Sequence, residues 1–191
     1  LLEAHEVLGP KRVGENSEGK PLHRFLPVQS FDEIDLDYET TGFSAKTFFL
    51  PFKENLSVFS FTEADWVQDV QYWDRPRALI GLHPCDINAL LKRDNVFARE
   101  FYPSPYYISR RKNTFVLGID HEPCEGGFCR SVNADTVTHG FDVFLTDLGT
   151  RYFAAIGSDR GFDLLQRFQI KDPSENDTHD YLQGRKRIAE A

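Results

Sequence analysis

Two short apolar runs, at residues 78–82 and 114–119, most constrain what this chain can fold into. Each run is rich in branched side chains, bounded by turn formers and too short for a typical helix, which is the pattern of a buried strand. The three cysteines of the chain, Cys85, Cys124 and Cys129, all follow closely after these runs. If the two strands are neighbours, the sulfurs converge at one sheet edge, and open α/β sheets bind ligands beyond the carboxyl ends of their strands. The sequence therefore predicts a metal or iron–sulfur site at that edge.

The other elements predict an α/β or α+β fold, with a mixed sheet flanked by short helices and the cysteine loops at one sheet edge. Apolar spacing indicates a helix over 86–99, with Cys85 or Asp86 at its N-cap. A second short helix over 106–112 is expected to start at a Ser104 cap. The alternation in 56–61 suits a half-buried strand.

Further along, residues 141–146 and 151–156 predict a hairpin, and a helix over 161–169 is expected behind a Ser158 cap. Residues 63–71 favour one more strand.

We expect three regions along the chain. Residues 1–40 form an N-terminal extension with the first strands, and before residue 25 they predict at most one weak strand or helix. Residues 41–170 form the main α/β domain with the cysteine site. Residues 171–191 are a polar tail, a solvated helix or a linker toward a further module.

The totals exclude several classes of protein. A net charge of −8 with no basic face disfavours nucleic-acid binding. No apolar run approaches the roughly 20 residues that a membrane helix needs. An odd number of cysteines cannot complete a disulfide framework, which indicates a reducing, cytoplasmic setting. Methionine is absent even at position 1, so we treat the sequence as processed or as a fragment.

Thiolate sulfur is the preferred protein ligand of iron–sulfur clusters and a good ligand for zinc. Cys85 is expected at a helix N-terminus, where the helix dipole stabilises a thiolate. Three sulfurs leave a four-iron cluster one ligand short. The nearby candidates for the fourth ligand are Asp86, His83, His121 and Asp120. Against this hypothesis, a buried cysteine is often only a small hydrophobic residue, and an Asp at this place is more often a helix cap.

Several blocks in order carry a family resemblance: A-K-T-F-F-L-P-F-K-E-N-L (45–56), G-L-H-P-C-D-I-N-A-L (81–90), P-Y-Y-I-S-R-R-K-N-T (105–114), F-C-R-S-V-N (128–133) and G-F-D-V-F-L-T-D-L-G (140–149). Together they resemble the N-terminal region of the iron–sulfur electron-transfer subunits of sulfhydrogenases (hydrogenase/sulfur reductase beta subunit) and of anaerobic sulfite reductases.

The resemblance implies a non-catalytic, cytoplasmic domain of an anaerobic oxidoreductase complex. It would relay electrons between a flavin subunit that uses NAD(P)H and a hydrogenase or sulfite reductase-type catalytic subunit that reduces sulfur, sulfite or protons. Cys85, Cys124 and Cys129 match the cysteine-bearing blocks and would hold a [4Fe–4S] cluster, with Asp86 as the expected fourth ligand. The family often has a further cysteine where this chain has Gly127, and a ferredoxin-like module that is not in this sequence.

Two alternatives stay open. The chain could be a docking domain whose cysteines are structural or hold zinc. It could also be an enzyme in which Cys85 is a helix-activated nucleophile.

Overall fold

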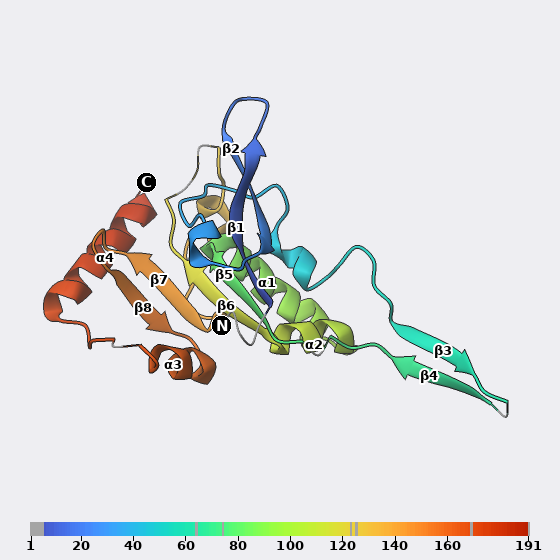
Figure 1. Cartoon of the computed structure of the whole chain (residues 1–191). Coiled ribbons are helices and arrows are strands. Elements are labelled where there is room, and N and C mark those ends of the chain that lie inside the picture. Colours follow the sequence, from blue (N-terminus) through green and yellow to red (C-terminus); the bar gives the residue numbers. More distant parts are fainter. Residues whose placement is uncertain are drawn as a thin grey trace.

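A six-stranded mixed sheet forms the body of the protein (Figure 1). The computed structural model describes residues 6–63, 65–73, 75–122, 124, 126–168 and 170–190, with only the backbone of residue 189. The strand order is β2-β1-β5-β6-β7-β8. Four of these strands are parallel and lie at the centre: β1 (Glu6–Glu15), β5 (Arg77–Leu82), β6 (Thr114–Ile119) and β7 (Val143–Asp147). The antiparallel edge strands are β2 (Pro21–Pro27) and β8 (Tyr152–Ile156). The predicted mixed α/β fold is confirmed.

The two apolar runs at residues 78–82 and 114–119 are neighbouring parallel strands, β5 and β6. Their register runs from Arg77 opposite Thr114 to Leu82 opposite Gly118. Both strands are almost wholly buried. A strand covered on both faces needs no polar side, which explains why these two runs are continuously apolar instead of alternating.

Helices cover both faces of the sheet. One face packs against α1 (Pro84–Ala98), α2 (Pro105–Lys112) and the 3₁₀ turn η2 (Ala45–Phe48), around the fully buried Phe49 and Tyr107. The other face packs against α3 (Asp159–Leu165). Shorter 3₁₀ turns are η1 (Phe31–Glu33) and η3 (Arg130–Val132). This produces a central sheet between two apolar layers.

Two of the predicted helix caps are confirmed and one is wrong. Ser104 accepts a hydrogen bond from the backbone N–H of Tyr107, and Ser158 accepts one from Gly161. Neither Cys85 nor Asp86 caps α1. The helix begins at Pro84 with His83 in the N-cap position, because proline suits the first helical turn, where its missing N–H would have no partner.

The N-terminal segment is more ordered than its sequence suggests. Residues 6–27 form a long β1–β2 hairpin, and β1 pairs with β5 at the centre of the sheet, so the expectation of one weak element before residue 25 is wrong. The β1–β5 pairing covers only residues 6–8. Pro10 therefore lies beyond the stretch that needs a free backbone N–H on that side.

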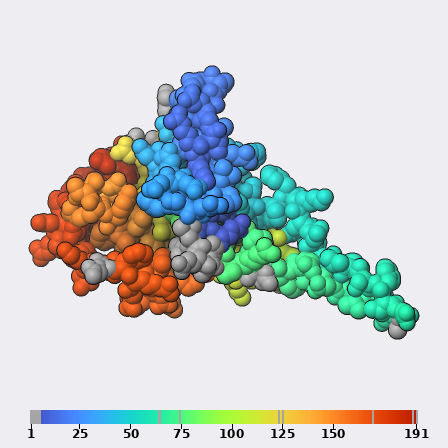
Figure 2. Space-filling model, viewed as in Figure 1, coloured from blue at the N-terminus to red at the C-terminus, as the bar shows by residue number. Residues whose placement is uncertain are grey.

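The predicted strands between residues 56 and 71 exist, but the half-burial predicted for residues 56–61 is wrong. β3 (Ser57–Phe61) and β4 (Trp66–Val70) form a separate two-stranded sheet. All of their residues are exposed except Ser57, which is half-buried. Figures 1 and 2 show this hairpin projecting from the body of the protein. The strand alternation was correct, but no other part of the described chain covers either face.

The polar C-terminal stretch forms helix α4 (Glu175–Glu190), which lies against the sheet near β7. Its Ile188 is buried. In the described residues no helix is long and apolar enough to cross a membrane.

Candidate functional site

The carboxyl ends of β5 and β6 bring the cysteine-bearing segments to one edge of the sheet. Leu82 at the end of β5 pairs with Gly118 of β6. Cys85 follows β5 in the first turn of α1, while Cys124 and Cys129 lie in the loop after β6. All three are half-buried free thiols. The expected placement at the ligand-binding edge of the parallel strands is therefore correct.

Cys85 and Cys129 lie together. Their thiols line the same small cavity and are close enough to affect each other's ionisation, although 44 residues separate them in the chain. Burial first, then the neighbouring Asp86 carboxyl and the Cys129 thiol, raise the pKa of Cys85 to about 12. The expected helix-stabilised thiolate is therefore wrong for the metal-free protein, because loss of water outweighs the helix dipole here.

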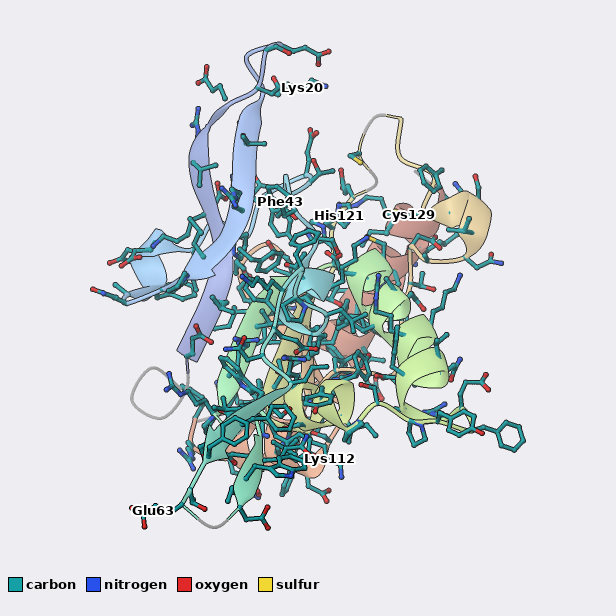
Figure 3. The ribbon with its side chains drawn as sticks, turned by 90° about the vertical axis from the view of Figure 1, so that its right-hand side faces the viewer. Lys20, Phe43, Glu63, Lys112, His121 and Cys129 are labelled. Atoms are coloured by element: carbon teal, nitrogen blue, oxygen red, sulfur yellow. The ribbon has the colours of Figure 1, made fainter. Side chains whose placement is uncertain are left out.

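A small cavity of about 10 Å³ lies at this pair of thiols, and its wall includes His121. Figure 3 shows Cys129 and His121 side by side at this end of the molecule. A cavity of this size holds about one water molecule. An inorganic cluster between these two thiols would thus require the loop after β6 to move outward.

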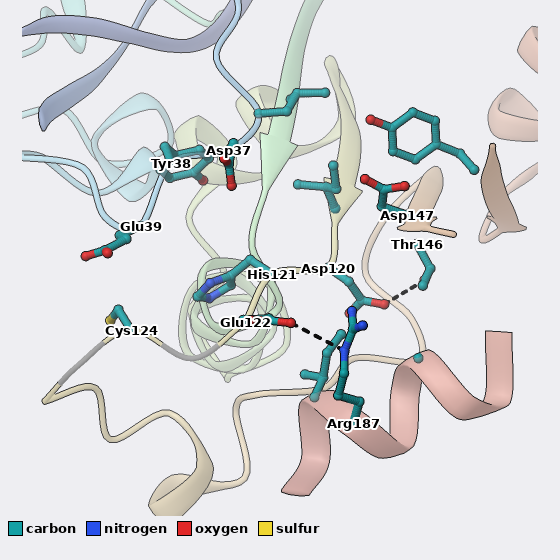
Figure 4. A pocket seen from close by; sticks show the side chains of 15 residues that line it. Asp37, Tyr38, Glu39, Asp120, His121, Glu122, Cys124, Thr146, Asp147 and Arg187 are labelled. Carbon is teal, nitrogen blue, oxygen red and sulfur yellow. Dashed lines mark hydrogen bonds and ion pairs between the residues drawn. The ribbon is translucent and has the colours of Figure 1, made fainter. Parts of the chain in front are cut away.

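Cys124 lines a different and larger cavity of about 640 Å³ (Figure 4). This cavity also contains His121, which is the side chain that the two cavities share. Gly127 allows a tight turn around Cys124, since a methyl group at Gly127 would lie 3.0 Å from the Cys124 sulfur and 2.9 Å from its carbonyl oxygen. The backbone N–H of Gly127 donates to that same carbonyl. Cys124 therefore lines a separate cavity that shares only the His121 side chain with the small cavity at Cys85 and Cys129.

Three aromatic rings stack beside the cysteines. The His83 ring lies between Tyr38, at 3.9 Å between centroids, and His121, at 3.8 Å. His83 is only 2% exposed, and its Nε2 has no hydrogen-bond partner within the described part of the chain. Burial, followed by the charge on His121, lowers the pKa of His83 to about 3, so its ring is neutral at neutral pH.

Sequence reasoning identified both histidines only as candidate ligands and missed Tyr38 altogether. Tyr38 reaches the site from the loop after η1, and its hydroxyl donates to the Gly81 carbonyl at 2.8 Å. Burial, then the charges of Asp86 and Cys85, raise the pKa of Tyr38 well above its usual value. A residue more than 40 positions away from the cysteines in sequence carries no local signal of this contact.

Asp86 lies under η2, where Ser44 donates a hydrogen bond to its Oδ1 at 3.0 Å. Burial raises the pKa of Asp86, while Ser44 and the nearby Lys46 oppose this. The carboxyl group therefore already has a structural partner that fastens η2 to the start of α1. The role of Asp86 as a ligand stays a prediction.

In the described part of the chain, no group of three Cys, His, Asp or Glu side chains is arranged to hold a single metal ion. In the structure, Cys85 and Cys129 therefore lie together and Cys124 lines the larger cavity. Asp86 accepts a hydrogen bond from Ser44. Cluster binding by these four residues stays a prediction.

Helix α4 forms part of the wall of the larger cavity. Asp120 follows β6 and is buried, accepting hydrogen bonds from Thr146 at 2.6 Å and from Arg185 of α4. Burial raises the pKa of Asp120, against the opposing effects of these two partners. Arg187 of the same helix pairs with Glu122 at 3.3 Å (Figure 4). The stretch expected to be a tail or linker is thus joined to the cysteine loop by two ion pairs.

Comparison with known proteins finds one clear similarity. The chain is 33% identical over 193 residues to "Sulfhydrogenase 2 subunit beta" of Pyrococcus furiosus, covering 100% of this chain and 54% of that protein. The chain thus spans about half the length of the curated relative. No family model matches the sequence, and no solved structure matches it. The similarity supports a relationship at the level of the sulfhydrogenase beta subunit family.

Proposed function

We propose that this chain is the iron–sulfur part of an electron-transfer subunit in a complex of the sulfhydrogenase type. It would pass electrons between a flavin subunit that uses NAD(P)H and a catalytic subunit that reduces sulfur, sulfite or protons. The observation that carries this proposal is the meeting of Cys85 and Cys129 at the ends of parallel strands, in a chain 33% identical to a sulfhydrogenase beta subunit. Three free thiols suit a reducing compartment, which favours the cytoplasm.

The chemical types of these side chains, thiolate and carboxylate, suit an iron–sulfur cluster. Cys85, Cys124 and Cys129 would supply three thiolates and Asp86 the fourth ligand of a [4Fe–4S] cluster. Such a cluster is larger than one metal ion, so its ligands need not converge on a point in the protein without it. A bound cluster supplies one-electron transfer. The high pKa of the Cys85 thiol means that ligation must release its proton, which makes cluster assembly easier as pH rises.

The side chains around the cysteines exclude water from them. The stacked rings of Tyr38, His83 and His121 form a wall beside them that limits access of solvent. The neutral His83 adds no positive charge to that wall. Solvent exposure and hydrogen bonds to sulfur set the reduction potentials of such sites, so this wall would tune the potential.

The two alternatives are supported less well. Zinc prefers four ligands converging in a tetrahedron, and the described residues offer no three that converge. The contact between the Cys85 and Cys129 thiols does favour a structural role in a docking domain, and that is the second candidate. A helix-activated nucleophile is disfavoured because the pKa of Cys85 is raised and not lowered.

The direct test is to reconstitute the anaerobically purified chain with iron and sulfide, then to measure both elements together with the visible and electron paramagnetic resonance spectra. We expect about four irons per chain, as for one [4Fe–4S] cluster. Serine at Cys85, Cys124 or Cys129 should each reduce the bound iron. Bound zinc without a visible chromophore, or no metal in a folded chain, would contradict the proposal.

The ligand role of Asp86 needs a matched pair of variants. Ser44→Ala removes the hydrogen bond between Ser44 and Asp86 but keeps the carboxylate, whereas Asp86→Ala removes both. Loss of iron in Asp86→Ala alone assigns Asp86 as a ligand. Equal loss in both variants assigns it a structural role, and His121→Ala then tests the histidine shared by the two cavities.

A further inference from the structure

The β3–β4 hairpin has a strongly biased composition. Between residues 54 and 74 the sequence has five acidic residues and no lysine or arginine. Most of its remaining side chains are apolar or aromatic. In the β3–β4 register, directly paired residues share a face, so Phe61 opposite Trp66 and Phe59 opposite Gln68 point to the same side.

That side of the hairpin is an aromatic face, defined here by Phe59, Phe61, Trp66 and Val70. Phe61 is 86% exposed, Trp66 is 54% exposed and Phe59 is 52% exposed. Apart from the contact between the Phe59 and Trp66 rings at 5.5 Å, no aromatic contact to this face is found within the described chain. Contiguous apolar surface of this kind on a projecting element marks an interaction site.

The root of the hairpin is firmly attached to the body, so it is an arm and not a loose loop. Tyr106 of α2 donates a hydrogen bond to the Leu56 carbonyl at 3.0 Å, and its ring packs on Tyr72. Asn113 donates to the Trp73 carbonyl at 3.1 Å. Both strands are therefore held where they leave the body, and the aromatic face is presented in a defined direction (Figures 1 and 2).

A two-stranded hairpin with no cover is marginally stable in water. The two strands of the arm pair only with each other, which leaves one unpaired backbone edge on each strand. Such edges are usually protected, and here the described chain provides no protection. The arm is thus a marginally stable hairpin that is held only at its root. This arrangement is expected of a segment whose exposed face and edges are covered by another molecule.

We propose that the β3–β4 arm inserts into a groove on another subunit of the same complex, with an apolar floor for the aromatic face and a Lys/Arg-rich rim. The acidic charge of the arm is the reason that we expect a partner with a basic surface. Glu63 and Asp65 lie in the turn between Phe61 and Trp66, and Asp69 points to the opposite face of the arm. No basic residue lies among them, so a basic rim pairs with them. A second copy of this chain is a poor occupant, because each copy carries a net charge of −8 and presents the same acidic arm.

This inference rests on the proposed function only in taking the chain to work inside a complex. It does not depend on what the cysteines bind, because the arm projects from the body beyond α2 while the cysteine loop follows β6 at the sheet edge. Iron content, measured in the same samples, therefore separates failure of the cluster proposal from failure of this one.

The test places a photo-crosslinking benzoylphenylalanine at Phe61 in the chain expressed from its own locus, and the intact complex is then purified and irradiated. The matched control carries the same group at Val13, an exposed apolar residue in the other hairpin. We expect position 61 to crosslink to a different subunit, at apolar residues bordered by lysine or arginine. Crosslinks to a second copy, to another part of the same chain, or to nothing in the intact complex would each overturn the proposal.

Substitutions measure the strength of the contact. Phe61→Ser and Trp66→Ser should weaken association with the crosslinked subunit by at least about tenfold, as for aromatic anchors of interfaces, whereas Val13→Ser should have no effect. Glu63→Lys should slow association at low salt and have less effect at high salt. Unfolding midpoints and iron content equal to those of the unmodified chain show that the variants are folded. Unchanged association in folded arm variants would refute the insertion.

Discussion

The chemical reactivity of Cys85 tests the description of the site most directly. We predict that, in the metal-free folded protein, this thiol reacts with iodoacetamide much more slowly than the same cysteine in the urea-unfolded chain. The reason is its pKa of about 12, which burial, the Asp86 carboxyl and the Cys129 thiol produce together. Only the thiolate is nucleophilic.

The size of the effect follows from two opposing factors. At pH 8 a thiol with a pKa of about 12 is about one part in 10⁴ thiolate, against about one part in four for an unperturbed cysteine. The more basic thiolate is intrinsically more nucleophilic, by about 30- to 60-fold for this difference in pKa. The net expectation is a rate on the order of 50-fold slower than in the unfolded chain, before any steric protection.

Isotope-coded iodoacetamide followed by mass spectrometry of the cysteine peptides gives the rate at each site separately. The rate at Cys85 should continue to rise tenfold per pH unit well above pH 9, where an ordinary cysteine levels off. A folded-state rate equal to the unfolded one would refute the reasoning, and a plateau near neutral pH would in addition restore Cys85 as an activated nucleophile.

Two further predictions concern stability. Gly161→Ala places a methyl group 1.9 Å from the Asp142 carbonyl oxygen, so we expect urea unfolding to show that the free energy of unfolding falls by about 1–3 kcal/mol. At Gly184 of α4 an added methyl group would have nothing within 4 Å, so Gly184→Ala should raise the free energy of unfolding by about 0.5–1 kcal/mol. Equal effects of the two substitutions would show that α3 is not packed as described. The pKa of His83 in the folded protein is lowered to about 3. As pH falls, this histidine therefore takes up a proton in the unfolded chain before it does so in the folded protein. We expect this one group to lower the free energy of unfolding by about 1.5 kcal/mol between pH 6.5 and 5. The raised pKa values of Asp86 and Asp120 act in the opposite direction. The quantity to measure is therefore the difference in the free energy of unfolding between the metal-free protein and its His83→Phe variant, as a function of pH. Parallel pH curves for the two proteins would contradict the buried neutral histidine.

Sequence patterns were sufficient where neighbouring residues decide the structure. The apolar runs of β5 and β6, the Ser104 and Ser158 caps and the hairpin of β7 and β8 depend on local spacing, and all of them are present. Their continuous apolar character indicated strands inside a sheet, while the parallel pairing of β5 and β6 with each other was an assumption of the sequence analysis that the structure confirms. That pairing places the cysteine segments at one edge.

Contacts between distant segments decided the rest. β1 includes glycine, proline and charged residues and looks like a loop, yet pairing with β2 and β5 makes it a strand. The stack of Tyr38 on His83 joins residues 45 positions apart, and the compartment of Cys124 is set by the turn at Gly127 and by α4. The alternation of β3 and β4 reports strand geometry but not what covers the strand.

The sequence by itself therefore determined that β5 and β6 are buried strands and which cysteines follow them, because spacing and burial act within a few residues along the chain. Only the tertiary structure decided that two thiols line one small cavity while the third lines another, and that an aromatic arm is left uncovered. Those outcomes depend on free energies of packing between segments far apart in the sequence, and such contacts leave no periodic trace in either segment alone.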